Sequence, residues 1–261
     1  MSPVVELKNV ARSYAHGGVF SRGESFCVLK DVNLTVNPGE CIGLIGLSGA
    51  GKSTLGRILL GIEAPDAGEV RILGRSAAGR ISVQQRRAVQ AVFQNALDSC
   101  NPRMSAFEIV AEPLRNFCGF KGTALRDRVA ELLEMTGISP DDMNKLPGRF
   151  SGGQLQRICI ARALAPQPQL ILLDEAVSAL DMLVQAQILD LLDALRRRLG
   201  TAYLFVTHDL RLIRRFCSRA VLLQEGVLKP FDPRTLKAAQ PLALLDELAD
   251  AMLPPLPPEM C

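Results

Sequence analysis

The chain has 261 residues and carries 30 Lys and Arg against 27 Asp and Glu, which gives a formal net charge of +3. This charge is too small for a protein that holds nucleic acid through phosphate neutralisation alone. Hydrophobic residues make up 48% of the chain, a share too high for intrinsic disorder. The length therefore predicts one large α/β domain or two small ones, each able to bury a core.

Membrane and secretory segments are not expected. The sequence has no run of about 18 uncharged apolar residues, and its start lacks a basic region followed by an apolar block. The seven cysteines are odd in number and form no CxxC pair. This pattern predicts reduced thiols in a cytoplasmic protein, with neither a zinc pair nor a disulfide framework.

The first third of the chain alternates between strand and helix patterns. Val4–Leu7 and Val28–Val36 are rich in β-branched residues and predict strands, with a glycine-rich loop at Ala15–Ser25 between them. Cys41–Gly46 is a short apolar run, typical of a strand buried on both faces of a parallel sheet. A helix is expected from Lys52 to about Leu60. A further strand is expected at Glu69–Leu73.

Helical patterns dominate from about Met104 to Leu164, where Ser105 and Glu108 have the spacing of a capping box. Leu170–Leu173 and Tyr203–Val206 then predict buried strands on either side of an amphipathic helix at Gln185–Leu199. This order of strands and helices indicates a parallel sheet with right-handed crossovers. The last expected strands are Ala220–Leu223 and Val227–Lys229.

A phosphate-binding loop is predicted between the buried strand and the first helix. The segment fits GxxxxGK[ST] and comprises Gly46, Leu47, Ser48, Gly49, Ala50, Gly51, Lys52 and Ser53, followed by Thr54. Glycines let backbone N–H groups converge on phosphate oxygens, and a helix N-terminus adds partial positive charge. Lys52 would lie near the β- and γ-phosphates and Ser53 would ligate Mg²⁺. The alternative is a glycine-rich turn that happens to contain a lysine.

Two carboxylates, Asp174 and Glu175, follow the apolar strand Leu170–Leu173. The carboxyl ends of parallel strands face the ligand crevice, so Asp174 is expected to hold Mg²⁺. Glu175 is expected to be the general base for an attacking water. The alternative is an acidic N-cap for the next helix.

The segment Phe150–Arg157 (FSGGQLQR) resembles the signature motif of ABC ATPases, usually Leu-Ser-Gly-Gly-Gln. By pattern alone, Ser151 and Gln154 form a capping box at the start of a helix. The resemblance implies more: Ser151, Gly152, Gly153 and Gln154 would meet the γ-phosphate held by the phosphate loop of a second ATPase subunit, so that each ATP lies between two chains.

The resemblance extends to four further motifs. Tyr14 resembles the aromatic residue that stacks on adenine, its alternative being a half-buried strand tyrosine, whereas Tyr203 is expected in the sheet core. Gln94 resembles the lid-loop glutamine that contacts Mg²⁺ and the attacking water. Ser178–Asp181 resembles the loop that reaches the opposite site, and His208 the switch histidine near the γ-phosphate. The implied catalytic set is Glu175, His208 and Gln94, and the implied Mg²⁺ ligands are Ser53, Gln94 and Asp174.

The family implies an α/β fold of the P-loop NTPase (ABC ATPase) type, with ATP and Mg²⁺ as cofactors. Its parts would be a parallel RecA-like core, an N-terminal antiparallel β subdomain and an α-helical subdomain inserted at roughly 95–165. We expect a single ABC ATPase domain at 4–230 and a short C-terminal tail at 231–261.

Asn101–Met104 (NPRM) and Ala111–Leu114 (AEPL) resemble the peptide/nickel importer family of ABC transporter ATP-binding subunits. Ala176-Val177 after the acidic pair and Thr207–Ile213 (THDLRLI) are similar to its nickel-importing type. The implied partners are a second, related but distinct ATPase subunit, two transmembrane permease subunits and a periplasmic or extracellular solute-binding protein. The implied location is peripheral, on the cytoplasmic side of the inner membrane, with Asn95–Leu146 docked on the permeases.

Other functions stay open at this stage. The cargo could be a di- or oligopeptide or another chelated metal, because His16 and His208 are the only histidines and form no ligand cluster with other residues. A non-transport ABC ATPase and an interaction module with an inactive site are further alternatives. Arginine clusters such as Arg196–Arg198 are expected to form a solvated helix face, and we expect no nucleic-acid partner.

Overall fold

The computed structural model describes residues 2–15, 25–77 and 81–232. Most of the predicted glycine-rich loop, including His16, lies outside these residues, as does nearly all of the predicted C-terminal tail. The strand that closes the described chain, β10, covers Val227–Phe231. It ends one residue beyond the predicted domain boundary at 230, and the division of the chain at that point stays a prediction.

The N-terminal part forms a four-stranded antiparallel sheet in the order β2-β1-β4-β5. The strands are β1 (Val5–Ala15), β2 (Ser25–Val36), β4 (Ala67–Ile72) and β5 (Arg75–Ser76). The first strand is longer than the predicted Val4–Leu7. Asn9 adopts a φ of 51°, and the pairing of β1 with β2 shifts register between Leu7 and Val10. This irregularity interrupts the alternation that sequence periodicity relies on.

The second sheet has six strands in the order β10-β9-β3-β8-β7-β6. All pairs are parallel except β10 with β9, which confirms the predicted parallel sheet. Its remaining strands are β3 (Cys41–Ile45), β6 (Val89–Phe93), β7 (Leu170–Asp174), β8 (Ala202–Val206) and β9 (Arg219–Gln224). Strand β6 was not predicted, because Gln90 interrupts its apolar run.

The two faces of this sheet bury different layers. Ile171, Leu173, Tyr203 and Phe205 face one core, and Leu170, Leu172, Leu204 and Val206 face the other. The first core includes residues of α5 (Gly152–Leu164), α6 (Met182–Leu199) and α7 (Leu210–Phe216). The second includes residues of α1 (Lys52–Leu59) and of the antiparallel sheet. Tyr203 is fully buried, as predicted.

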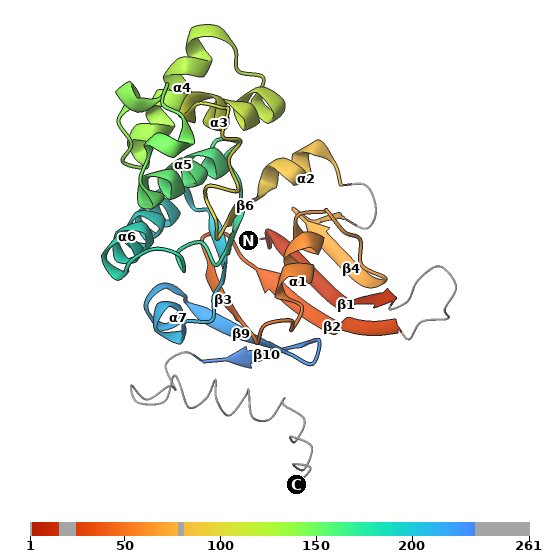
Figure 1. Ribbon diagram of the computed structural model, residues 1–261. Coiled ribbons are helices and arrows are strands. Elements are labelled where there is room, and N and C mark those ends of the chain that lie inside the picture. Colours follow the sequence, from red (N-terminus) through yellow and green to blue (C-terminus); the bar gives the residue numbers. More distant parts are fainter. Residues whose placement is uncertain (1, 16–24, 78–80, 233–261) are drawn as a thin grey trace.

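The helices between β6 and β7 form a group of their own at one end of the molecule (Figure 1). They are α3 (Ala106–Pro113), a π-helical turn (Leu114–Cys118), α4 (Gly122–Met135), two 3-10 turns (Pro140–Asp142 and Pro147–Arg149) and α5. Helix α5 packs on both α3 and α4. The predicted capping box starts α3: the Ser105 N–H donates to Glu108 Oε2 at 2.7 Å. A shorter helix, α2 (Val83–Ala88), precedes β6.

Neither a membrane span nor a disulfide occurs in the described chain. None of its helices is long and apolar enough to cross a bilayer. The six cysteines within the described ranges are free thiols. Two pairs of them come close, with Sγ atoms 3.7 Å apart for Cys41 and Cys217 and 3.5 Å apart for Cys100 and Cys159.

Candidate active site

The phosphate loop joins β3 to α1 and depends on glycine at several positions. Gly49 and Gly51 have φ values of 80° and 103°, a region that residues with a Cβ rarely adopt. A Cβ on Gly51 would also lie 2.7 Å from a methyl of Val28, and a Cβ on Gly46 would lie 2.7 Å from the carbonyl oxygen of Leu223. Both close approaches disfavour larger residues at Gly46 and Gly51, which keeps the backbone of the loop in this conformation.

Lys52 lies at the start of α1 with its ammonium group turned back over the loop. Its Nζ donates to the carbonyl oxygens of Gly46 at 2.7 Å and Leu47 at 2.8 Å. Burial lowers the pKa of Lys52, and the nearby charges of Glu175 and Asp174 oppose this shift. The loop mouth therefore holds a partly desolvated cation between backbone oxygens and two carboxylates, in a position suited to an anionic ligand.

Asp174 is the last residue of β7, and it pairs with Phe93 of β6 and Val206 of β8. The three strands therefore end at the same level. Burial raises the pKa of Asp174, the charge of Glu175 raises it further, and Lys52 opposes both effects. A half-buried carboxylate of this kind gains from a nearby cation, because the countercharge offsets its desolvation.

Glu175 follows with a φ of 48°. This left-handed conformation is costly for a residue with a Cβ, and such strain clusters at functional sites. The Glu175 N–H donates to the carbonyl of Val206 at 3.0 Å, which ties the residue to β8. His208, which follows β8, has its Nδ1 3.4 Å from Glu175 Oε1. The exposed imidazole and the carboxylate thus face one another across the strand ends.

These groups line one cleft of about 810 Å³, within the size range of small-molecule sites. The predicted residues in its lining are Gly46, Leu47, Ser48, Gly49, Gly51, Lys52, Ser53, Thr54, Gln94, Asp174, Glu175 and His208. The structure therefore brings together residues from the ends of β3, β6, β7 and β8 that are up to about 160 positions apart in the sequence.

Five further residues line the cleft and were not predicted: Val28, Phe93, Asn95, Asp98 and Ser99. Asn95, Asp98 and Ser99 belong to a polar loop directly after Gln94. Asn95 Nδ2 donates to Asp98 Oδ2 at 2.6 Å. Their closeness to Gln94 in the sequence was an available signal. Val28 lies on β2, and only the packing of one sheet against the other brings it to the loop.

Tyr14 and Ala50 are not among the residues that line this cleft. The Tyr14 hydroxyl donates to Glu63 Oε2 at 2.5 Å and lies 3.3 Å from Thr54 Oγ1. The Arg12 guanidinium lies over the tyrosine ring, 5.1 Å from its centroid. Tyr14 is therefore held next to the phosphate loop, and its stacking on adenine stays a prediction.

The signature segment forms a capped helix N-terminus away from the cleft. The Ser151 N–H donates to Gln154 Oε1 at 2.9 Å, and the Gln154 N–H donates to Ser151 Oγ at 3.2 Å, which confirms the predicted capping box. Ser151, Gly152 and Gln154 are exposed, and no residue of Ser151–Gln154 lines the cleft.

Asp181 is also part of the helix capping of this chain. Its Oδ1 accepts from the N–H groups of Leu183 at 3.1 Å and Val184 at 3.0 Å, so it starts α6. The first turn of α6 also explains why residue 153 is a glycine, because a Cβ there would lie 2.6 Å from a methyl of Val184.

Within the described residues no group of three or more His, Cys, Asp or Glu could hold a metal ion.

Known proteins agree with this geometry. A model of the ABC transporter family matches residues 29–178, more than half of the chain. The nickel import ATP-binding protein NikE of Rhodospirillum rubrum is 46% identical over 238 residues, covering 90% of this chain and 86% of that protein. NikE of Escherichia coli (strain K12) is 42% identical over 226 residues, covering 85% and 84%.

Solved structures point the same way. The ATP-binding cassette MJ0796, in a dimeric post-hydrolysis state with ADP and Pi, is 33% identical with a TM-score of 0.76, covering 89% of this chain and 100% of that one. The cbiO1 protein of Clostridium perfringens has a TM-score of 0.78 over 95% and 96% of the two chains, and at 24% identity it supports the fold alone. The fold, the cleft and these likenesses confirm the resemblance found in the sequence, and the chain belongs to the ABC transporter family as an ATP-binding cassette.

Proposed function

We propose that this chain is the ATP-hydrolysing subunit of a nickel importer, a translocase that couples hydrolysis to transport. The observation that carries the proposal is the convergence of Lys52, Asp174, Glu175 and His208 in one cleft at the ends of adjacent strands. The nickel import proteins named above support nickel as the cargo, since they share more than 40% of the aligned residues over most of the chain.

Mg²⁺ fits the oxygen atoms of this cleft. Ser53, Gln94 and Asp174 all line it and offer hydroxyl, amide and carboxylate oxygens, the donors that Mg²⁺ prefers. The raised pKa of Asp174, caused first by its burial, supports a cation nearby. When bound, Mg²⁺ would neutralise charge on the phosphates. In our proposal Lys52 binds the phosphates and Gln94 orients the attacking water. Glu175 accepts the proton of that water, and His208 holds the Glu175 carboxylate in position.

The second half of each site would come from another ATPase subunit. The exposed Ser151–Gln154 turn lies outside the cleft of its own chain, which supports a role opposite a partner's phosphate loop. Asp181 starts the neighbouring helix, and a methyl of Val184 in its first turn reaches the signature glycine Gly153. We propose a related but distinct chain as partner, with both signature turns completing ATP sites.

Contact with the permease subunits is proposed at an apolar groove of about 400 Å³ between the inserted helices and the core. Ile62, which is 66% exposed, and Phe93, which is 41% exposed, contribute to its lining together with Phe117. Phe93 also lines the nucleotide cleft, so this groove lies next to Gln94. Docking there would hold the chain at the cytoplasmic side of the inner membrane, with a solute-binding protein on the other side.

The test of the ATPase uses the purified chain reconstituted in liposomes with the proposed permease subunits and partner ATPase from the same organism. We expect Mg²⁺-dependent ATP hydrolysis that increases when the nickel-loaded solute-binding protein is added. No stimulation by that protein, with intact hydrolysis, would contradict the transport role and favour a non-transport ABC ATPase.

Cargo is tested by uptake in a deletion strain. We expect uptake of radioactive ⁶³Ni²⁺ to be lost on deletion and restored by the wild-type gene but not by a Lys52→Ala variant. The control measures uptake of a labelled dipeptide in the same strains. Loss of dipeptide uptake with normal nickel uptake would overturn nickel as the cargo and favour the peptide alternative.

A further inference from the structure

A second cavity, of about 420 Å³, lies at the amino ends of the parallel strands, opposite the nucleotide cleft at their carboxyl ends. Ala88, Gln169 and Thr201 line it, and they stand directly before or at the amino ends of β6, β7 and β8. The nucleotide cleft lies at the carboxyl ends of the same strands. The two sites are therefore separated by the length of the sheet.

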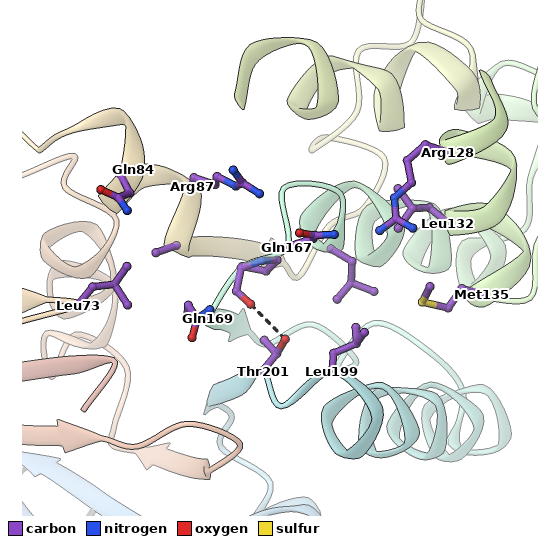
Figure 2. Close-up of a pocket in the computed structure, with 13 residues that line it drawn as sticks. Leu73, Gln84, Arg87, Arg128, Leu132, Met135, Gln167, Gln169, Leu199 and Thr201 are labelled. Atoms are coloured by element: carbon purple, nitrogen blue, oxygen red, sulfur yellow. Dashed lines mark hydrogen bonds between the residues drawn. The ribbon is translucent and has the colours of Figure 1, made fainter. Parts of the chain in front are cut away.

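We call this space the seam cavity, because its walls come from two parts of the fold. Helix α4 of the inserted group supplies Arg128, Leu132 and Met135, and helix α2 beside the core supplies Gln84 and Arg87. Figure 2 shows the two arginines on opposite sides of the cavity, with Gln167 between them and Gln169 and Thr201 below. A ligand here would touch both parts of the fold.

The lining combines an apolar floor with cationic sides. Leu132 and Leu164 are 1% and 3% exposed, and Met135 and Leu199 extend this surface. Arg87 and Arg128 are the only charged residues that line the cavity within the described chain. An apolar ligand with one negative group matches this lining, whereas a cation would meet two guanidinium groups and no carboxylate.

Both arginines are held in place by contacts that leave donor capacity. Arg87 Nε donates to the carbonyl of Pro166 at 2.8 Å, one of the five N–H groups of a guanidinium. Arg128 Nη1 pairs with Glu131 Oε2 at 2.5 Å, and its side chain is 19% exposed against 54% for Glu131. The arginine is thus the inner member of the pair, and the carboxylate points to solvent.

The end of the cavity at the sheet is rigid. The Gln169 N–H donates to the carbonyl of Ala88 at 2.8 Å, and Thr201 Oγ1 donates to the carbonyl of Pro168 at 3.1 Å (Figure 2). Gln167 has a φ of 57° between two prolines, so this turn has little freedom to collapse into the space. A preformed cavity of this kind binds with little loss of conformational entropy.

We propose that the seam cavity is a binding site for a small amphipathic anion, a short hydrocarbon or aromatic body with one carboxylate or sulfonate group. The apolar body would lie on Leu132 and Leu164, and the anionic group would accept hydrogen bonds from Arg87 and Arg128. The volume accommodates one chain of moderate length and excludes a two-chain lipid.

The test measures binding of octanoate to the nucleotide-free protein by titration calorimetry. The matched probes are octanol, which lacks the charge, and octylammonium, which reverses it. We expect one octanoate per chain, with octanol and octylammonium bound at least about tenfold more weakly, because hydrogen bonds to charged groups contribute about that factor or more. Bound octanoate should also raise the thermal unfolding midpoint.

Three variants locate the site. Arg87→Gln with Arg128→Gln should weaken octanoate binding about tenfold or more, and Leu199→Trp, at a lining residue that is 45% exposed, should block it by filling space. Arg126→Gln is the control, since Arg126 is exposed on α4, the helix of Arg128, and does not line the cavity. Unchanged octanoate binding in the double variant, or equal binding of octylammonium, would overturn the proposal. These readouts involve neither ATP nor nickel.

Discussion

The N-termini of α1 and α5 both follow glycine-containing turns, but their N–H groups are satisfied in different ways. Gly51 caps α1 with no side-chain hydrogen bond, and the loop before it lines an 810 Å³ cleft. Ser151 and Gln154 cap α5 with each other's side chains, on an exposed surface. The first N-terminus has no side-chain cap, while in the second the capping box satisfies the Gln154 N–H within the free chain.

The difference suggests a division of labour between the two segments. The phosphate loop has its cation, its acidic neighbours and its histidine in one cleft, so it can bind nucleotide within a single chain. The signature turn has no such surroundings in its own chain. We therefore expect changes in the phosphate-loop cleft to alter binding and chemistry in the isolated chain. Changes in the signature turn should act only when two chains assemble.

The largest effect is expected from Glu175→Gln, which removes the proposed proton acceptor and keeps the size of the side chain. Turnover should fall by about 10²- to 10⁴-fold, the usual contribution of a general base. ATP binding should persist, and with the partner ATPase present the variant should accumulate as a closed dimer, measured by light scattering with ATP. Asp190→Asn, at a side chain that is 71% exposed, is the control. Hydrolysis at the wild-type rate would show that the general-base assignment is wrong.

Lys52→Ala tests whether the phosphate loop before α1 binds nucleotide within a single chain. Loss of the ammonium that we propose to contact phosphate should weaken ATP binding by about 10- to 100-fold, measured by calorimetry on the isolated chain. Lys8→Ala serves as the control, because the Lys8 side chain is 56% exposed on the antiparallel sheet. Equal ATP affinity in wild type and Lys52→Ala would remove the distinction between the two helix N-termini.

Ser151→Ala tests whether the signature turn acts only when two chains assemble. It should cost about 1 kcal/mol of unfolding free energy through the lost cap, leave ATP affinity of the single chain unchanged, and lower turnover of the assembled transporter. Ser105→Ala is a matched control, since Ser105 forms the same capping box on α3. Both variants should lose similar stability, but only Ser151→Ala should lose turnover. Equal losses of turnover would reduce the signature serine to a structural cap.

The smallest effect concerns Glu40, which precedes the phosphate-loop strand and accepts from Arg219 Nε at 2.6 Å. Burial acts to raise the pKa of Glu40, but bonds from Arg219 and from the Asn37 N–H outweigh it and lower the pKa. A lowered folded-state pKa stabilises the fold above the unfolded value of about 4.3, and this contribution is lost as pH falls through the folded value.

Urea unfolding of wild type and Glu40→Gln measures this contribution. The difference in unfolding free energy should be about 1 kcal/mol at neutral pH and should shrink toward zero in acid. Glu69→Gln, which breaks a more exposed ion pair with Arg71, should change stability less. A difference that does not vary with pH would show that the Glu40 charge does not anchor this strand.

Continuous apolar strands made most of the site predictable. Cys41–Ile45 and Leu170–Leu173 are short, uninterrupted and followed directly by chemistry-bearing residues, so local sequence alone indicated both the strands and the groups at their ends. Tyr203–Val206 was predicted in the same way, but His208 beyond it was identified by resemblance. Strand β6 escaped prediction because Gln90 breaks the pattern, although Gln94 beyond it was identified by resemblance. The family resemblance also supplied the inserted helices as a unit.

The features of the structure that the sequence did not predict come from long-range packing. Val28 reaches the cleft because β2 lies against the phosphate loop, as its 2.7 Å approach to a Cβ on Gly51 shows. No local pattern carries that information. The orientation of Tyr14 likewise depends on its packing partners. Glu63 is about 50 residues away, and Arg12 lies on the same face of β1. The seam cavity is built from seven separate elements or loops, and it has no sequence motif.

The strand order has a consequence for how the protein is made. Strand β3, which carries the phosphate loop, pairs with β8 and β9 on its two sides, so about 160 to 180 residues separate it from its neighbours in the sheet. Such long-range pairing slows folding, and a ribosome releases the N-terminal part first. The nucleotide site can therefore be completed only after β9 has emerged. Until then this apolar strand has no partners in the sheet, and exposed apolar surface of this kind favours aggregation during synthesis.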